Sequence, residues 1–136
     1  MELALGVGLL LVPAVLLVMS FGPWLERRTF VRLASAEAAR AVVLSGGDGE
    51  AALGVVAALA VGYGIDPDDV IVGLCGDPVG LAEAAGRGCG RPARGGTVDV
   101  IVGVRVPLVA TPFGGVGGVE IEHRHTEVVD LYRSLP

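Results

Sequence analysis

A charge-free apolar run opens this chain and restricts what it can fold into more than any other feature. The run covers residues 3–25, with Glu2 before it and Glu26, Arg27 and Arg28 directly after it. At ~1.5 Å of helical rise per residue, its 23 residues reach ~34 Å, and the hydrocarbon core of a bilayer is about 30 Å thick. The sequence therefore predicts a transmembrane helix over residues 1–25.

A cleaved secretory signal is the alternative interpretation of this run. Such signals have a positively charged start, an apolar stretch of about 7–15 residues and a small-x-small cleavage site. Here the start is acidic and the run is longer, and Arg27, Arg28 and Phe30 follow it in place of an Ala-x-Ala site. The sequence therefore favours a retained helix.

Prolines, a glycine and a tryptophan inside the run bear on its geometry. Pro13 is tolerated because neighbouring groups in a membrane re-satisfy the carbonyl that a proline frees. Gly22 and Pro23 are expected to kink the helix or to mark its exit from the membrane. Trp24 lies where an aromatic side chain anchors a helix at the membrane–water interface.

The remaining length and the charge narrow the class of protein. About 110 residues follow the helix, which is the size of one domain. The net charge is −5 and no basic stripe is present, so nucleic-acid binding is not expected. The chain has only three Phe, two Tyr and one Trp, so its core must be aliphatic.

Residues 26–61 are expected to form an amphipathic helical region that continues the membrane helix. Alanine, the best helix former, recurs between residues 29 and 44. Apolar positions repeat there at three- and four-residue spacing, which predicts one face that needs a cover. That face comprises Phe30, Leu33, Ala34, Glu37, Ala38, Ala41 and Val42, while Arg28, Arg32, Ser35 and Arg40 fall outside it. Asp48 is expected to cap a further helix over residues 50–61.

Residues 62–136 are expected to form a small β domain, because the apolar period changes there from 3.6 to 2. Strands are predicted at 70–74, 97–108 and 119–129, with the last two paired as a hairpin around a turn at 114–118. Valines at alternate positions from 98 to 106 share one face, which is typical of a half-buried strand. Residues 76–96 are a Gly/Pro/Arg-rich excursion with one helical turn at 81–85.

The predicted fold class is α+β. A long N-terminal transmembrane and amphipathic helix packs on a small antiparallel β-sheet of about three strands. The valine face of the sheet is expected to meet the alanine-rich face of the helix. This order of elements is pilin-like.

The two cysteines, Cys75 and Cys89, are 14 residues apart. In an extracytoplasmic domain an even pair indicates a disulfide. Two free thiols and half of a metal site are the alternatives, and the absence of any CxxC spacing makes structural zinc the weaker of these. The sequence favours the disulfide.

Patterns for catalysis and metal binding are thin. His123 and His125 share one face of the last strand, but Glu120 and Glu122 before them fall on the opposite face, so a third ligand would have to come from elsewhere. Asp66, Asp68 and Asp69 lack a DxDxDG loop and are expected to cap helix or strand ends instead. We expect no enzyme, no metal site and no cofactor.

Three stretches of the chain carry a resemblance to a known family. Glu2, Leu3, Ala4 and Leu5 open an aliphatic run that contains Pro13, residues 33–41 read LASAEAARA, and residues 119–134 close the chain's last strand. The first resembles the opening of TadE-like proteins, and the second resembles the segment that follows their membrane helix. The third is similar to the C-terminal strand of the actinobacterial members. TadE-like proteins are minor pseudopilins of the tight-adherence (Flp) pilus system, and the cysteine pair also fits the actinobacterial members.

The resemblance implies a subunit involved in the assembly or structure of a surface pilus. Its partners would be other pilin-like subunits and the pilus assembly machinery, in the membrane or in a filament. The resemblance implies that Glu2 is the assembly residue, paired with a neighbouring subunit's amine. A carboxylate at the edge of an apolar helix is costly unless it is paired, and the alternative is that Glu2 is simply solvated at the headgroups. Only Met1 precedes Glu2, whereas a prepilin leader with a glycine cleavage site is expected there.

Helix packing in such an assembly depends on small residues, because lipid removes the hydrophobic drive between helices. Ala4, Gly6, Gly8 and Ala14 supply them. The alternative function is a membrane-anchored extracytoplasmic accessory or binding protein, whose helix only tethers it and has no polymerising role.

Charge and cysteines give opposite predictions for the side on which the domain lies. Arg27, Arg28 and Arg32 follow the helix, and by the positive-inside rule they would place the domain in the cytoplasm. The cysteine pair and the glycine-rich β domain favour the outside. We expect a single-pass membrane protein with its C-terminal domain outside the cytoplasm.

Overall fold

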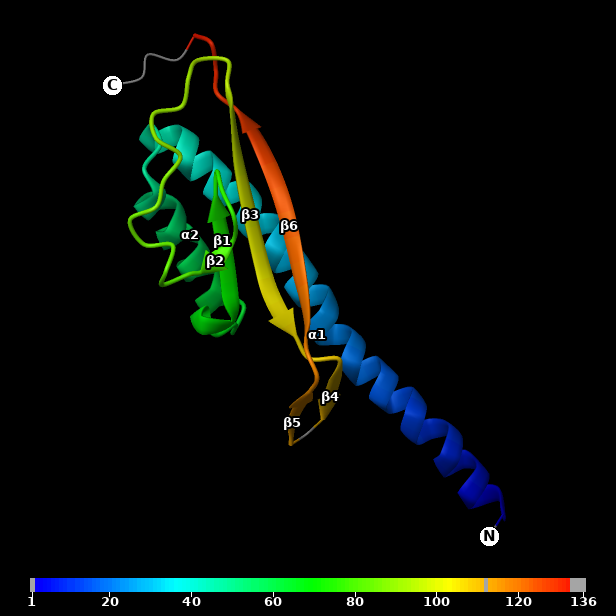
Figure 1. Cartoon of the computed structure of the whole chain (residues 1–136). Helices are drawn as coiled ribbons and strands as arrows, with labels where there is room; N and C mark the ends of the chain where they lie inside the picture. The colour runs from blue at the N-terminus through cyan, green and yellow to red at the C-terminus, as the bar shows by residue number, and fades with distance from the viewer. Residues whose placement is uncertain (1, 112, 133–136) are drawn as a thin grey trace.

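One unbroken helix, α1 (Glu2–Ser45), is the spine of the molecule. The structure is a computed structural model that describes the backbone of residues 2–111 and 113–132, with side chains for 5–109 and 113–132. The N-terminal end of α1 projects beyond all other elements, and its C-terminal half lies along the sheet (Figure 1). The predicted continuity of the membrane helix and the amphipathic helix is confirmed.

Both prolines of the run lie inside α1, at Pro13 and Pro23. The helix therefore continues past Gly22 and Pro23, and an exit from the membrane at this point stays a prediction. Each proline removes one backbone hydrogen bond, but the turns beyond Pro23 are fixed by packing that begins at Phe30, whose side chain is completely buried.

Two glycines end α1, and an aspartate starts the next helix. Gly46 and Gly47 have φ angles of 79° and 105°, in the left-handed region that favours glycine, and the Gly47 N–H donates to the Val42 carbonyl. Asp48 then caps α2 (Gly49–Gly62), accepting from the Glu50 N–H at 2.9 Å. The predicted cap is confirmed, and α2 folds back against α1.

The buried face of α1 is rotated from the predicted one. It comprises Phe30, Val31, Ala34, Ser35, Ala38, Ala39, Val42 and Val43. Leu33 and Glu37 are exposed, so assigning them to the core face is wrong, as is placing Ser35 outside it, whereas Ala41 is half-buried and packs against the core. The physical reason is that α1 contacts α2 as well as the sheet, and two partners bury a wider arc than a single stripe.

The main sheet is antiparallel and four-stranded, in the order β2-β1-β3-β6. Its strands are β1 (Val70–Leu74), β2 (Val79–Gly80), β3 (Thr97–Val106) and β6 (Val119–Val128). One face packs on α1 (Figure 1), and all five alternating valines of β3 are buried there. The α+β fold, the long β3–β6 pairing and the valine face are confirmed.

A second, two-stranded hairpin of β4 (Val109–Thr111) and β5 (Gly114–Val116) separates β3 from β6. The predicted strand to residue 108 and the predicted turn at 114–118 are therefore wrong. β3 ends before Pro107, which has no N–H to continue the ladder.

Short turns complete the domain. Asp66 caps the 3-10 helix η1 (Pro67–Asp69) by accepting from the Asp68 N–H at 3.0 Å, which confirms a capping role for this aspartate. At 81–85 the chain makes a single hydrogen-bonded turn, in which the Ala84 N–H donates to the Gly80 carbonyl four residues back, as in one turn of a helix.

Candidate functional site

The N-terminal half of α1 is an uncovered apolar surface. All large apolar side chains from Leu5 to Leu25 are exposed, and none of the most apolar 18-residue window of the helix is buried. The helix is long and apolar enough to cross a membrane. A surface of this size needs either lipid or other protein chains around it.

The predicted assembly and packing residues lie on this half of the helix. Glu2 and Ala4 belong to α1, but their side chains lie outside the described residues. A Cβ atom built on Gly6 or Gly8 would meet nothing within 4 Å, and Ala14 is exposed. These last three are therefore open to contact by other molecules, which leaves their packing role a prediction.

The β4–β5 hairpin is a second apolar surface, which the sequence interpretation missed. From Val106 to Val119 the chain has no charged residue, and Thr111 alone has a polar side chain. Phe113 near its tip is fully exposed. The signal for this surface is the second charge-free stretch itself, although its residue pattern predicts only the end of a strand and a turn.

Close backbone packing fixes the shape of the hairpin. A Cβ on Gly115 would lie 2.4 Å from Pro107 Cβ, so no other residue fits there without movement. Gly117, with a φ of 73°, would bring a Cβ within 2.9 Å of the Leu108 side chain. Glycine at these two positions therefore allows the second strand of the hairpin to pack closely against Pro107 and Leu108, where the hairpin begins.

A hydrogen bond ties that root to α1. The Arg27 Nη1 donates to the Arg105 carbonyl at 2.9 Å, and Arg105 is paired in register with Glu120 on β6. Arg27 is the second residue after the apolar run of α1, and Arg105 and Glu120 directly flank the uncharged hairpin stretch. The two apolar surfaces therefore begin at one level of the molecule.

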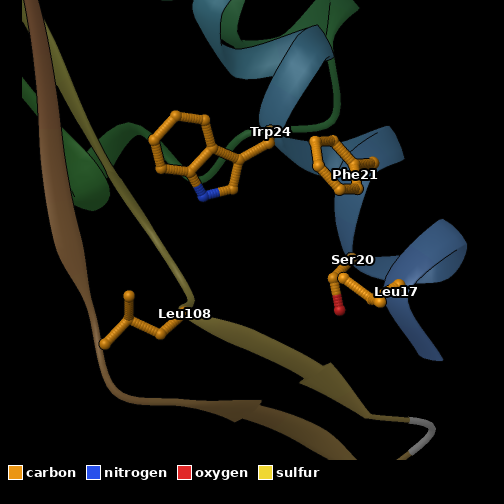
Figure 2. Close-up of a pocket in the computed structure, with 5 residues that line it drawn as sticks. All are labelled: Leu17, Ser20, Phe21, Trp24 and Leu108. Atoms are coloured by element: carbon orange, nitrogen blue, oxygen red, sulfur yellow. The ribbon is translucent and has the colours of Figure 1, made fainter. Parts of the chain in front are cut away.

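Below that level, a groove of about 310 Å³ separates the hairpin from α1. It is lined by Leu17, Ser20, Phe21, Trp24 and Leu108. Figure 2 shows Trp24 and Leu108 on opposite sides of the groove, with Ser20 further along the helix. The Ser20 hydroxyl donates to the Leu16 carbonyl, so its polar group is satisfied within the helix.

A polar pair lies between the upper half of α1 and the sheet. Ser35 is completely buried, and its Oγ lies 3.0 Å from His123 Nδ1 and 3.1 Å from the Arg32 carbonyl. When the hydroxyl donates to that carbonyl, the imidazole N–H donates to the hydroxyl. Burial, followed by the positive charges of Arg32 and His125, lowers the pKa of His123.

The two histidines of β6 share the face toward α1, as predicted, and differ in their partners. His125 Nε2 lies 3.2 Å from Glu127 Oε2, while His123 contacts Ser35. Within residues 2–111 and 113–132, no group of three or more His, Cys, Asp or Glu side chains is placed to hold a metal ion. His123 thus serves the helix–sheet contact, whereas His125 pairs with a side chain of its own strand.

The cysteines form the predicted disulfide, with their Cα atoms 5.2 Å apart. The bond closes the loop between β1 and β3, and this loop packs on the α1–α2 connection. A Cβ on Gly47 would lie 1.8 Å from the Gly90 carbonyl oxygen, and one on Gly49 equally close to the Arg87 carbonyl oxygen. The loop and the helix connection therefore need glycine on the helix side to approach each other.

Comparison with family models, with curated proteins and with solved structures finds no match for this chain.

Proposed function

We propose that this chain is a membrane-anchored, pilin-like subunit that takes part in the assembly or structure of a surface pilus. The observation that carries the proposal is the division of α1 into two halves without a break. One half is covered by the fold and the other is left bare. A helix of this kind holds a subunit in the bilayer and, in a filament, presents the same bare surface to neighbouring helices. The role requires no catalysis.

The sequence resemblance to TadE-like minor pseudopilins supports the same function. It places a carboxylate, Glu2, at the start of the bare half and small residues, Gly6, Gly8 and Ala14, along it. Small residues permit close helix approach where lipid offers no hydrophobic drive. The partners are therefore other pilin-like subunits and the assembly machinery.

The disulfide supports a location outside the cytoplasm, because disulfides persist in oxidising compartments. A reporter fused after Pro136 that is active only outside the cytoplasm tests this location. We expect activity from that reporter and none from a cytoplasmic one, and the reverse pattern would contradict the location.

Substitution of the assembly residue tests the pilus function. Glu2→Ala should abolish incorporation into filaments and leave membrane insertion intact, since it only removes a polar group from an apolar helix. Glu37→Ala is the matched control, because Glu37 is an exposed carboxylate on the covered half of the same helix. Wild-type incorporation of the Glu2→Ala protein would remove the proposed role of this residue.

Cross-linking separates the subunit from a simple tether, the alternative function. The disulfide uses both native cysteines, so a single added cysteine is the only free thiol that can form a cross-link. Ala14→Cys should cross-link to neighbouring helices, whereas Leu16→Cys, about 200° away around the helix, should not. Cross-linking at neither position would favour the tether.

A further inference from the structure

We propose that the β4–β5 hairpin is a second membrane contact, and that it inserts its apolar tip into the interface of the bilayer beside α1. The occupant of this surface is lipid. The inference rests on the proposed membrane anchoring of α1 and goes beyond it, because a tether or a pilin helix needs no second contact.

The chemistry of the hairpin matches that of the helix run. Residues 106–119 are uncharged, as are residues 3–25, and both stretches are bounded by charged residues. Phe113 is fully exposed and Val116 is 66% exposed, although an ordinary surface turn would be polar. The exposure of large apolar side chains on a short hairpin therefore needs a cover that the chain does not supply.

The level of the hairpin identifies that cover. The Arg27–Arg105 hydrogen bond fixes its root beside the charged end of the apolar run. From there the hairpin descends beside α1, so that Leu108 faces the helix across a groove lined at Leu17 and Trp24 (Figure 2). Residues 17 to 26 span ~13 Å of helix axis at ~1.5 Å per residue. A bilayer that surrounds the whole run of α1 therefore also reaches the hairpin.

The depth of insertion is limited by the backbone. A two-stranded hairpin has unpaired N–H and C=O groups along its outer edges, and these cannot be satisfied in hydrocarbon. The headgroup layers provide water and add about 5–8 Å on each side of the core. The hairpin therefore lies in the interface, at the depth where Trp24 anchors the helix.

Lipid fits this surface better than a second copy of the chain does. The exposed side chains are spread along the whole hairpin: Leu108 lines the groove, Val109 and Val116 lie opposite each other in register, and Phe113 stands at the turn. A protein partner covers one side of such an arm, whereas lipid surrounds it. The same lipid continues onto the bare surface of α1.

Tryptophan fluorescence in vesicles tests the proposal. Trp24 is the only tryptophan, so Trp24→Phe removes the native tryptophan fluorescence. Phe113→Trp in that variant then adds a single fluorescent probe. The protein is reconstituted in phosphatidylcholine vesicles with bromine near the headgroup or near the end of one acyl chain. We expect a blue-shifted emission that headgroup-proximal bromine quenches more strongly than chain-end bromine, and little quenching by aqueous iodide.

Tyr132→Trp in the same background is the matched control. Tyr132 is an aromatic residue that is 94% exposed, and it follows the end of β6 opposite the hairpin (Figure 1). It should be quenched by iodide and not by bromine. A probe at 113 that behaves like the one at 132 overturns the proposal. A blue-shifted probe at 113 without bromine quenching shows a protein cover, such as a second copy, and also overturns it.

The native Trp24 distinguishes failure of this inference from failure of the anchoring. If bromine quenches Trp24 in the unmodified chain and not the probe at 113, the anchoring stands and the hairpin contact is wrong. If bromine leaves Trp24 unquenched as well, both the membrane anchoring and the hairpin contact are wrong.

Discussion

The two halves of α1 have the same backbone structure and opposite surroundings. Residues 5–25 are bare, whereas from Phe30 to Val43 one side of the helix is packed on α2, β3 and β6. The bare half has large Leu and Val side chains on all sides. The covered half places alanines where the sheet approaches and arginines where it does not.

The contrast shows that apolar content alone does not place a helix segment in a protein core. A segment that is apolar all round has no preferred side to bury, so no single partner covers it. Ala34, Ala38 and Ala39 are completely buried, and their small side chains let the neighbouring elements α2, β3 and β6 approach the helix backbone. Packing thus follows from small residues on one side, with charges on the other.

The largest effect is expected from comparing two variants, each with an alanine of α1 replaced by aspartate, one in the covered half and one in the bare half. Ala38→Asp places an unpaired carboxylate in the core, where Ala38 is completely buried, and should lower the free energy of unfolding by at least about 3 kcal/mol. Ala14→Asp should leave the domain's urea midpoint unchanged and reduce membrane integration, at a cost of about 2.5–3.5 kcal/mol. Urea unfolding in detergent micelles and carbonate extraction of membranes measure the two effects.

A loss of domain stability in Ala14→Asp would break this comparison. It would show that the bare half is coupled to the core. Ala14→Ser, which is small and uncharged, controls for the change of side chain and should preserve both stability and integration.

Removal of the disulfide should have an intermediate effect on stability, confined to the folded domain that covers the C-terminal half of α1. The double substitution Cys75→Ala and Cys89→Ala frees a loop whose ends are 14 residues apart, and should lower the free energy of unfolding by about 3 kcal/mol. The difference in urea midpoint between oxidised wild type and the double variant measures it. An equal midpoint would mean that the packing of the loop on the α1–α2 connection holds it without the bond.

The smallest expected effect is a pH dependence of the stability of the folded domain. Burial, Arg32 and His125 lower the folded-state pKa of His123 from 6.5, so the unfolded chain takes up a proton first as the pH falls. The free energy of unfolding should therefore be fully present above pH 6.5, decrease below it, and level off below the folded-state pKa. Urea midpoints from pH 7.5 down to about 4.5 measure this.

His123→Gln should flatten the part of this pH dependence that His123 contributes. The matched control is His125→Gln, two residues along the same strand face, which should keep most of it. An unchanged pH profile in His123→Gln would show that other groups govern the response.

Local chemistry was sufficient to predict several elements in advance. The alternating valines of β3, the Asp48 cap, the disulfide and the continuity of α1 each depend on residues close in sequence or on one simple pairing. The rotated core face of α1 was not predictable in this way. Ser35 is buried because α2 folds back and His123 arrives from a strand 88 residues away.

The order of residues by itself set the length and apolar character of the helix, the α+β class and the valine face, because these follow from local periodicity and from the cost of burying charge. The tertiary fold alone settled which arc of α1 is covered and where the uncharged stretch at 106–119 lies. That stretch is a short hairpin, too small to be stable alone, and its place beside the helix follows from the β3–β6 register and from the hydrogen bond between Arg27 and Arg105. Long-range pairing of this kind leaves no periodic signal in the chain.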